Sequence, residues 1–291
     1  MEDQASRLRE LVRDGQVSVP AHQARIIVVT SGKGGVGKTN VSVNLALAMG
    51  QLGKRVILFD ADMGMANVDV MLNMSPTHTL TDVLAGRKTL AEVLLPIDQG
   101  VQLVPGGSGI AQLAALESAR LEATVHRLSE LERLSDLMIV DTGAGISPNV
   151  LGFVLAAPEV IVVTTPEPTS IVDAYGIIKA IDQRNPHAHV WLLVNMCASE
   201  QEARSVYDRL VTIIARFLGV KVRLLGWIER DAHVGKSVLQ QRPFLKSYPG
   251  STAARRVIEL AERLLGVSGS SGAQERQGFF ARWGQWFAPR N

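Results

Sequence analysis

Short runs of consecutive apolar residues recur along most of the chain. They occupy residues 26–29, 56–59, 101–104, 137–140, 160–163, 190–194 and 222–225, and segments with helix-like spacing separate most of them. Fully apolar strands that alternate with helices predict an α/β fold, with a mostly parallel sheet covered by helices on both faces. Ligands of such sheets bind beyond the carboxyl ends of the strands, so polar residues after these runs are candidates for a functional site.

The segments outside this alternating region differ from it in character. Residues 1–24 combine a short amphipathic helical pattern with a polar linker, and we expect the α/β domain to span residues 25–266. A Gly- and Ser-rich linker at 267–274 precedes a C-terminal helical segment at 275–291. The pattern therefore predicts one large domain with an appendage at each end.

Composition narrows the class of protein. The 291 residues carry a formal net charge of +2, so no overall positive field argues for nucleic-acid binding, and we expect no direct nucleic-acid partner. The single cysteine, Cys197, excludes a disulfide framework within the chain. No apolar run approaches the roughly 18 residues of a membrane span and no secretory signal is visible, so we expect a cytoplasmic protein.

The first apolar run leads into a glycine-rich loop. The loop and the start of the next helical segment read Gly32, Lys33, Gly34, Gly35, Val36, Gly37, Lys38, Thr39 and Asn40. A strand, a glycine loop and a helix are the context of a P-loop, in which backbone N–H groups and the helix N-terminus bind phosphates. There Lys38 can reach the β- and γ-phosphates, and the Thr39 hydroxyl can ligate Mg²⁺. The pattern predicts a nucleotide site.

Acidic residues follow two further strands. Asp60 and Asp62 end the second run, and Asp141 closes the run at 137–140 like the acid of a Walker B motif. Beside a P-loop, two carboxylates at one strand exit can both face a Mg²⁺-nucleotide, and the Walker B acid can hold the water shell of the ion. The alternative for each is a helix cap or turn, which Asp also favours.

Lys33 is a feature that an ordinary P-loop lacks. The string KGGVGKT, with Lys33 ahead of Lys38, resembles the deviant Walker A motif of the MinD/ParA ATPases. Within that group the chain resembles the flagellar-number regulators called FlhG, FleN or YlxH, over nearly its whole length. The resemblance implies ATP and Mg²⁺ as ligands and a homodimer that forms with ATP, in which Lys33 crosses to the nucleotide of the partner subunit.

The resemblance also implies roles for single residues. Asp62 lies where the family orients the attacking water, so Asp62, Lys33 and Lys38 are the expected catalytic residues. Asp60 matches a Mg²⁺-linked carboxylate of the first switch, and joins Thr39 and Asp141 as an expected metal residue. The family has an Asn that bonds the adenine edge, and this chain has Asn195 there.

Two positions depart from the family pattern. Gly143 stands in the second switch where MinD commonly has proline, which suggests a more pliable turn and leaves Asp141 in place. Glu229 replaces a proline that relatives carry after the isoleucine, so Asn195 is the better candidate for recognising the base.

The N-terminal segment resembles a second functional element of the FlhG group. Asp3, Gln4 and Ala5, followed by Leu8 and Arg9, look like the activator motif that stimulates FlhF, a GTPase of the signal-recognition-particle type. The resemblance implies that Gln4 assists hydrolysis in the active site of FlhF, and that flagellar C-ring proteins are further partners. Without the resemblance, a frayed tail would explain so short a segment better.

Aromatic residues are concentrated near residue 280. Three of the seven Phe and two of the four Trp fall in the last thirteen residues, namely Phe279, Phe280, Trp283, Trp286 and Phe287. At about 100° per residue they share one face of a helix, which favours binding at the headgroup boundary of a membrane. An ATP-bound dimer would present two such helices and bind more tightly than a monomer. The alternative is that this face docks on the protein's own core.

Together these features predict an ATP-hydrolysing switch that dimerises with ATP, attaches reversibly to the inner face of the cell membrane, controls flagellar number or placement, and activates FlhF. A MinD-type division-site ATPase and a ParA-type DNA-partitioning ATPase are alternatives with the same core. The DNA-partitioning alternative needs a basic surface, and no dense Lys/Arg run supplies one. An electron-transfer ATPase needs cysteines at its dimer axis, and Cys197 lies outside both switches.

Overall fold

The fold is built on one eight-stranded sheet. The computed structural model describes residues 23–62, 67–107, 118–267 and 278–287. At residues 118–123 and 287 it describes the backbone alone. The strand order is β3-β4-β2-β5-β1-β6-β7-β8, and all neighbours pair in parallel except β3 and β4. The strands are β1 Arg25–Ser31, β2 Val56–Ala61, β3 Leu95–Asp98, β4 Val101–Val104, β5 Leu137–Ala144, β6 Glu159–Thr164, β7 His189–Cys197 and β8 Val222–Glu229. The predicted α/β fold is confirmed.

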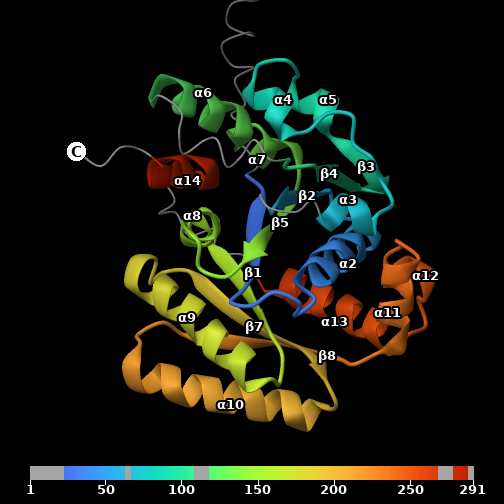
Figure 1. Ribbon diagram of the computed structural model, residues 1–291, viewed down its shortest axis with the longest axis vertical. Coiled ribbons are helices and arrows are strands. Elements are labelled where there is room, and N and C mark those ends of the chain that lie inside the picture. Colours follow the sequence, from blue (N-terminus) through green and yellow to red (C-terminus); the bar gives the residue numbers. More distant parts are fainter. Residues whose placement is uncertain (1–22, 63–66, 108–117, 268–277, 288–291) are drawn as a thin grey trace, which may run out of the picture.

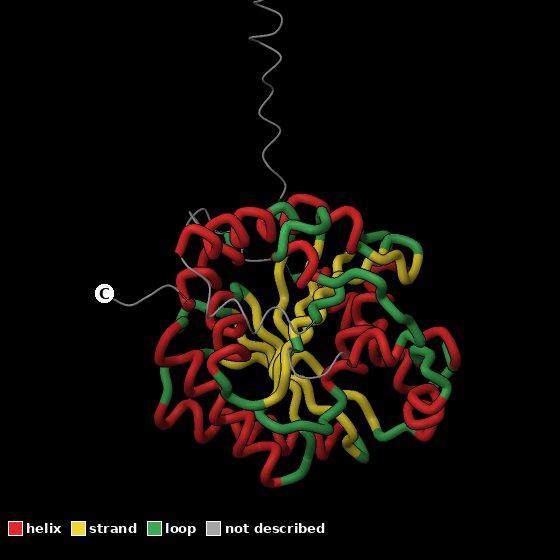
Figure 2. Tube along the Cα trace, turned by 45° about the horizontal axis from the view of Figure 1, so that its top comes forward, coloured by secondary structure: helices red, strands yellow, loops and turns green. Residues whose placement is uncertain are grey.

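Helices cover both faces of this sheet (Figure 1). One face carries α2 Lys38–Gln51, α12 Phe244–Ser247 and α13 Thr252–Gly266, and the other carries α6 Ser118–Ser129, α8 Pro148–Ala156, α9 Pro168–Arg184 and α10 Glu200–Phe217. The shorter helices are α3 Asn67–Met71, α4 Leu80–Leu84, α5 Leu90–Val93, α7 Leu131–Leu134 and α11 Ala232–Leu239. Figure 2 shows the strands in the interior, with helices around them.

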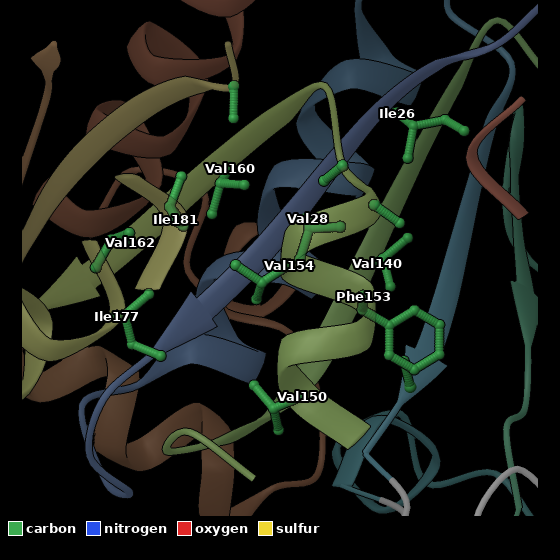
Figure 3. Close-up of a cluster of buried hydrophobic side chains, with 14 of the residues drawn as sticks. Ile26, Val28, Val140, Val150, Phe153, Val154, Val160, Val162, Ile177 and Ile181 are labelled. Carbon is green, nitrogen blue, oxygen red and sulfur yellow. The ribbon is translucent and has the colours of Figure 1, made fainter. Parts of the chain in front are cut away.

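The pleat of the strands explains why their runs are continuously apolar. Along β1, Ile27 and Val29 belong to the hydrophobic cluster under α2 and α13, whereas Ile26 and Val28 belong to the cluster under α8 and α9. Figure 3 shows the second cluster, with Phe153 contributed by α8. Burial of each such side chain stabilises the fold by about 1.5–3 kcal/mol, so a strand buried on both faces favours apolar residues at every position.

The apolar pattern missed β3. This strand pairs antiparallel with β4 at the edge of the sheet, contains Pro96, and is only partly buried. Proline has no N–H for the ladder and is tolerated on edge strands. A half-exposed edge strand therefore carries no continuous apolar run that sequence reasoning could detect.

The C-terminal helix α14, Phe279–Phe287, packs against α6 and α8. The side chains of Phe279, Phe280 and Trp283 are at most 1% exposed. Docking on the protein's own core, the alternative considered for this aromatic face, is thus the arrangement in the structure. These three side chains can reach lipid only if α14 leaves this position, so membrane binding by α14 stays a prediction that requires its release.

Several predicted features lie outside the described residues. They include the N-terminal residues Asp3, Gln4 and Ala5, the side chain of Phe287, and most of the linker at 267–274. Within the described ranges, no helix has the length and apolar character needed to cross a membrane.

Candidate functional site

The glycine loop joins the end of β1 to the start of α2, where the sequence predicts it. Gly35 and Gly37 have φ values of 80° and 83°, in the left-handed region that favours glycine, and Gly37 is the N-cap of α2. A Cβ on Gly32 would overlap the backbone of Asp173 in α9. Backbone conformation or close packing therefore requires glycine at three positions of a loop that ends on a helix N-terminus, a position that favours a bound phosphate.

A cleft of about 920 Å³ opens over this loop. Its lining includes parts of two segments that we call switch I (residues 60–69) and switch II (residues 141–146). The predicted site residues in the lining are Lys33, Gly34, Gly35, Val36, Gly37, Lys38, Thr39, Asn40 and Asp62. Asp60, Asp141 and Asn195 are buried and contact residues of this lining. The structure thus brings the loop and both switches to one cleft of small-molecule size.

Lys38 and Asp141 form a buried ion pair at the base of the cleft. Lys38 Nζ lies 2.9 Å from Asp141 Oδ1, and the Ser42 hydroxyl donates to the same oxygen at 2.7 Å. Asp141 is fully buried, and its Oδ2 has no hydrogen-bond partner among the described residues. A buried carboxylate oxygen without a donor is costly, so this oxygen is well suited to a cation or its bound water.

Asp60 lies beside Asp141 on the neighbouring strand. It accepts hydrogen bonds from the backbone N–H groups of Asp62 and Val68, at 3.1 and 3.4 Å. Burial raises the pKa of Asp60 to about 7, and the negative charge of Asp141 adds to the rise. Two adjacent acids with Thr39 in the nearby cleft fit Mg²⁺. Within the described residues, no three His, Cys, Asp or Glu side chains come together as a metal site.

Asp62 lies where the two switches meet. Its Oδ2 accepts a hydrogen bond from Asn67 Nδ2 at 3.1 Å, and a Cβ on Gly143 would be 3.4 Å from Asp62 Oδ1. A Cβ at that distance would make van der Waals contact with the carboxylate, so Gly143 of switch II lies directly beside Asp62 of switch I. Asp62 lines the cleft and is only partly buried, so it can contact water there. Its assignment as the residue that orients the attacking water remains a prediction.

Lys33 bonds to the N-terminal end of α9. Its Nζ lies 2.7 Å from Glu167 Oε2 and 3.2 Å from Thr169 Oγ1, and all these groups are exposed. The hydrogen bond from Lys33 lowers the pKa of Glu167. Ion pairs exposed to water are weak, so Lys33 can leave Glu167 at little cost in free energy.

Asn195 ties β7 to the glycine loop. Its Nδ2 donates to the Val36 carbonyl at 2.7 Å in a buried position, and a Cβ on Gly37 would overlap the Asn195 side chain. The next residue, Met196, has φ of 58° and also lines the cleft. The loop support by Asn195 is a finding, whereas its contact with adenine stays a prediction.

Two residues near the site, Ser42 and Glu167, had no role predicted from the sequence. Ser42 could have been found from its spacing, because it lies one helical turn after Lys38. Glu167 accepts a hydrogen bond from Lys33, which is 134 residues away in the sequence, and no local sequence pattern predicts such a contact. Glu229, which replaces a family proline, pairs with Arg256 at 2.7 Å and so has a structural partner.

Comparisons with known proteins agree with this geometry. The ParA family, described as NUBPL iron-transfer P-loop NTPase, matches residues 22–265. Antiactivator FleN of Pseudomonas aeruginosa is 43% identical over 243 residues, which cover 84% of this chain and 87% of FleN. Flagellum site-determining protein YlxH of Helicobacter pylori is 34% identical over 273 residues, 91% of each chain. The septum site-determining protein MinD of Pyrococcus horikoshii, solved with Mg-ADP, has a TM-score of 0.68 at 27% identity, covering 83% of this chain and 96% of that chain.

Proposed function

Since this chain belongs to the ParA family of P-loop NTPases, we propose that it is an ATP-driven switch that controls flagellar number or placement. ATP hydrolysis with Mg²⁺ follows from the family, and the similar MinD structure holds Mg-ADP. The flagellar role is inferred from FleN and YlxH, an antiactivator and a flagellum site-determining protein. The observation that carries the proposal is the 43% identity to FleN across a domain whose cleft joins a P-loop to two switches.

Different residues in and beside the cleft have different roles in hydrolysis. Phosphoryl transfer to water needs neutralised phosphate charge and an oriented nucleophile. Lys38 neutralises charge on the phosphates, and Thr39, Asp60 and Asp141 would hold the Mg²⁺ that adds to this neutralisation. Asp62, which reaches the cleft between the switches, accepts a hydrogen bond from the attacking water.

A homodimer would complete this site. Among the described residues, Lys33 Nζ bonds to the exposed groups of Glu167 and Thr169, so it is available to a nucleotide in a second subunit. Apolar side chains are exposed at Val70 and Val238 in the cleft lining, at Ile146 in switch II, and at Val172 near the start of α9. Exposed apolar groups around a site favour a protein interface there. ATP would bridge two such faces, with Lys33 of each subunit reaching the nucleotide of the other.

The partners are those of the flagellar group. We propose that Gln4 and its neighbours stimulate the GTPase FlhF, and that flagellar C-ring proteins bind a surface of the ATPase domain. A candidate surface is the end of α10, where Ile213 and Phe217 are exposed one turn apart. Arg209 and Arg216 are also exposed on this helix, so the surface combines apolar and basic character.

Membrane attachment would depend on release of α14. In the docked position its aromatic face is buried, so a docked monomer should bind lipid poorly. The test is co-sedimentation of the full chain with anionic liposomes in ADP and in ATP, run beside a DNA-binding assay. Sedimentation with ATP but not with ADP would support the switch. Equal sedimentation in both nucleotides, or binding to DNA alone, would reject it in favour of another role for the ATPase.

A further inference from the structure

Ser42 lies one helical turn beyond Lys38, fully buried on α2. Its hydroxyl is 2.7 Å from Asp141 Oδ1 and 3.1 Å from the Lys38 carbonyl oxygen. A hydroxyl has one proton to donate, and the shorter contact, to a carboxylate, is the stronger of the two. Asp141 is therefore the main acceptor. A residue needed only to fill this helix position would require no hydroxyl.

Two donors hold Asp141 Oδ1, and nucleotide binding affects them differently. Lys38 Nζ donates at 2.9 Å, but in a P-loop this lysine contacts the phosphates once a nucleotide is bound. Ser42 is buried on α2 and does not line the cleft, so its bond does not depend on the occupancy of the cleft. When Lys38 turns to the phosphates, Ser42 is left as the hydroxyl that fixes the carboxylate.

We propose that Ser42 is a positioning residue for Mg²⁺. It holds Asp141 by Oδ1, so that Oδ2, which has no hydrogen-bond partner among the described residues, would remain available to the ion or its bound water. The inference rests on the proposed nucleotide site and extends it to a residue outside the glycine loop and both switches. Partners that orient metal-binding groups commonly change metal affinity by about 10- to 100-fold when they are removed.

The test is a Mg²⁺ titration of the binding of a fluorescent ATP analogue to the full chain. Ser42→Ala removes the hydroxyl and keeps a good helix former. We expect the Mg²⁺ concentration at half-saturation to rise about tenfold, while the affinity for the analogue in EDTA stays at the wild-type value. Ser42→Cys, with a weaker donor of similar shape, should shift the half-saturation in the same direction by less.

Ser237→Ala is the matched control. Ser237 is equally buried in a helix, and its hydroxyl donates to the Val234 carbonyl at 2.7 Å. This variant also leaves a buried hydrogen bond unmade, so it should lose thermal stability without nucleotide while keeping the wild-type Mg²⁺ dependence. An unchanged half-saturation in both Ser42 variants, or an equal rise in Ser237→Ala, would overturn the proposal. Failure of the wild-type chain to bind the analogue with Mg²⁺ would instead reject the nucleotide site itself.

Discussion

Trp283 of α14 stacks on Phe153 of α8, with ring centroids 5.0 Å apart and ring planes inclined by 22°. Helix α8 begins at Pro148, directly after switch II, and the Pro148 carbonyl accepts a hydrogen bond from Trp286 Nε1 at 2.9 Å. The C-terminal helix is therefore packed on the element that follows a nucleotide switch. A movement of switch II that shifts α8 would disturb the site at which α14 docks.

Gly284→Ala should release α14 without changing its aromatic face. A Cβ at this position would overlap the side chain of Val125 in α6, which is β-branched and stiff. Overpacking of this kind costs about 1–3 kcal/mol, whereas Ala favours the helix itself by about 1 kcal/mol relative to Gly. We expect faster hydrogen exchange in α6 and α8, and liposome co-sedimentation that no longer requires ATP.

Gly176→Ala is the control for this variant. Gly176 lies inside α9, and an added Cβ there would meet nothing within 4 Å. It should leave exchange in α6 and α8, and the nucleotide dependence of sedimentation, at wild-type values. Liposome binding by Gly284→Ala that still required ATP would mean that docking of α14 does not limit membrane attachment.

Asp60→Asn should change the pH dependence of stability in the absence of Mg²⁺ and nucleotide. The pKa of Asp60 is about 7 in the folded chain, against about 3.9 in the unfolded chain. At a pH between these two values, the folded state therefore binds a proton on Asp60 that the unfolded state does not. Wild-type stability therefore loses up to about 1.4 kcal/mol per pH unit from this group as pH rises through that window. In urea unfolding with EDTA, the free energy of unfolding of Asp60→Asn should rise relative to that of the wild type from about pH 4 to 7. Above about pH 7 the difference between the two free energies should be constant. A constant difference throughout would refute the raised pKa.

Asp62→Ala should bind ATP and hydrolyse it slowly. Asp62 is in the cleft between the switches, and its truncation leaves Lys38, Thr39 and Asp141 in place. Loss of a group that orients or deprotonates a nucleophile typically costs a factor of about 100 or more in turnover. Steady-state phosphate release measures this loss, and fluorescence titration checks that nucleotide affinity is retained. Turnover at the wild-type rate would remove Asp62 from its assigned role.

A peptide of residues 1–20 should accelerate GTP hydrolysis by FlhF, because the activator motif lies wholly within it. The Gln4→Ala peptide should have no effect, since the proposed contribution to hydrolysis comes from that side chain. Multiple-turnover GTP hydrolysis with each peptide at equal concentration provides the measurement. If the wild-type peptide left the rate of GTP hydrolysis unchanged, the activator role would be rejected in favour of a frayed tail.

Local patterns in the sequence predicted the main strands and the nucleotide loop, because both depend on neighbouring residues. The position of α14 could not be predicted in the same way, since one aromatic face suits lipid and a protein core equally. Its docking depends on distant groups. Glu132 accepts hydrogen bonds from the Phe280 N–H at 3.0 Å and from Gln23 Nε2 at 2.6 Å, and so joins the start of α14 to the first described residues of the chain. No rule based on residue spacing predicts a contact among Glu132, Phe280 and Gln23.

The molar mass of the full chain in solution tests the proposed switch most directly. In the Asp62→Ala background, which slows loss of ATP, light scattering should give twice the mass with ATP that it gives with ADP. Adding Lys33→Ala should leave nucleotide binding intact and hold the mass at that of one chain, because Lys33 would no longer reach the partner's nucleotide. A stable ATP-dependent dimer of the Lys33→Ala variant, or an unchanged mass of the Asp62→Ala chain with ATP, would contradict an ATP-driven dimer in which Lys33 acts across the interface.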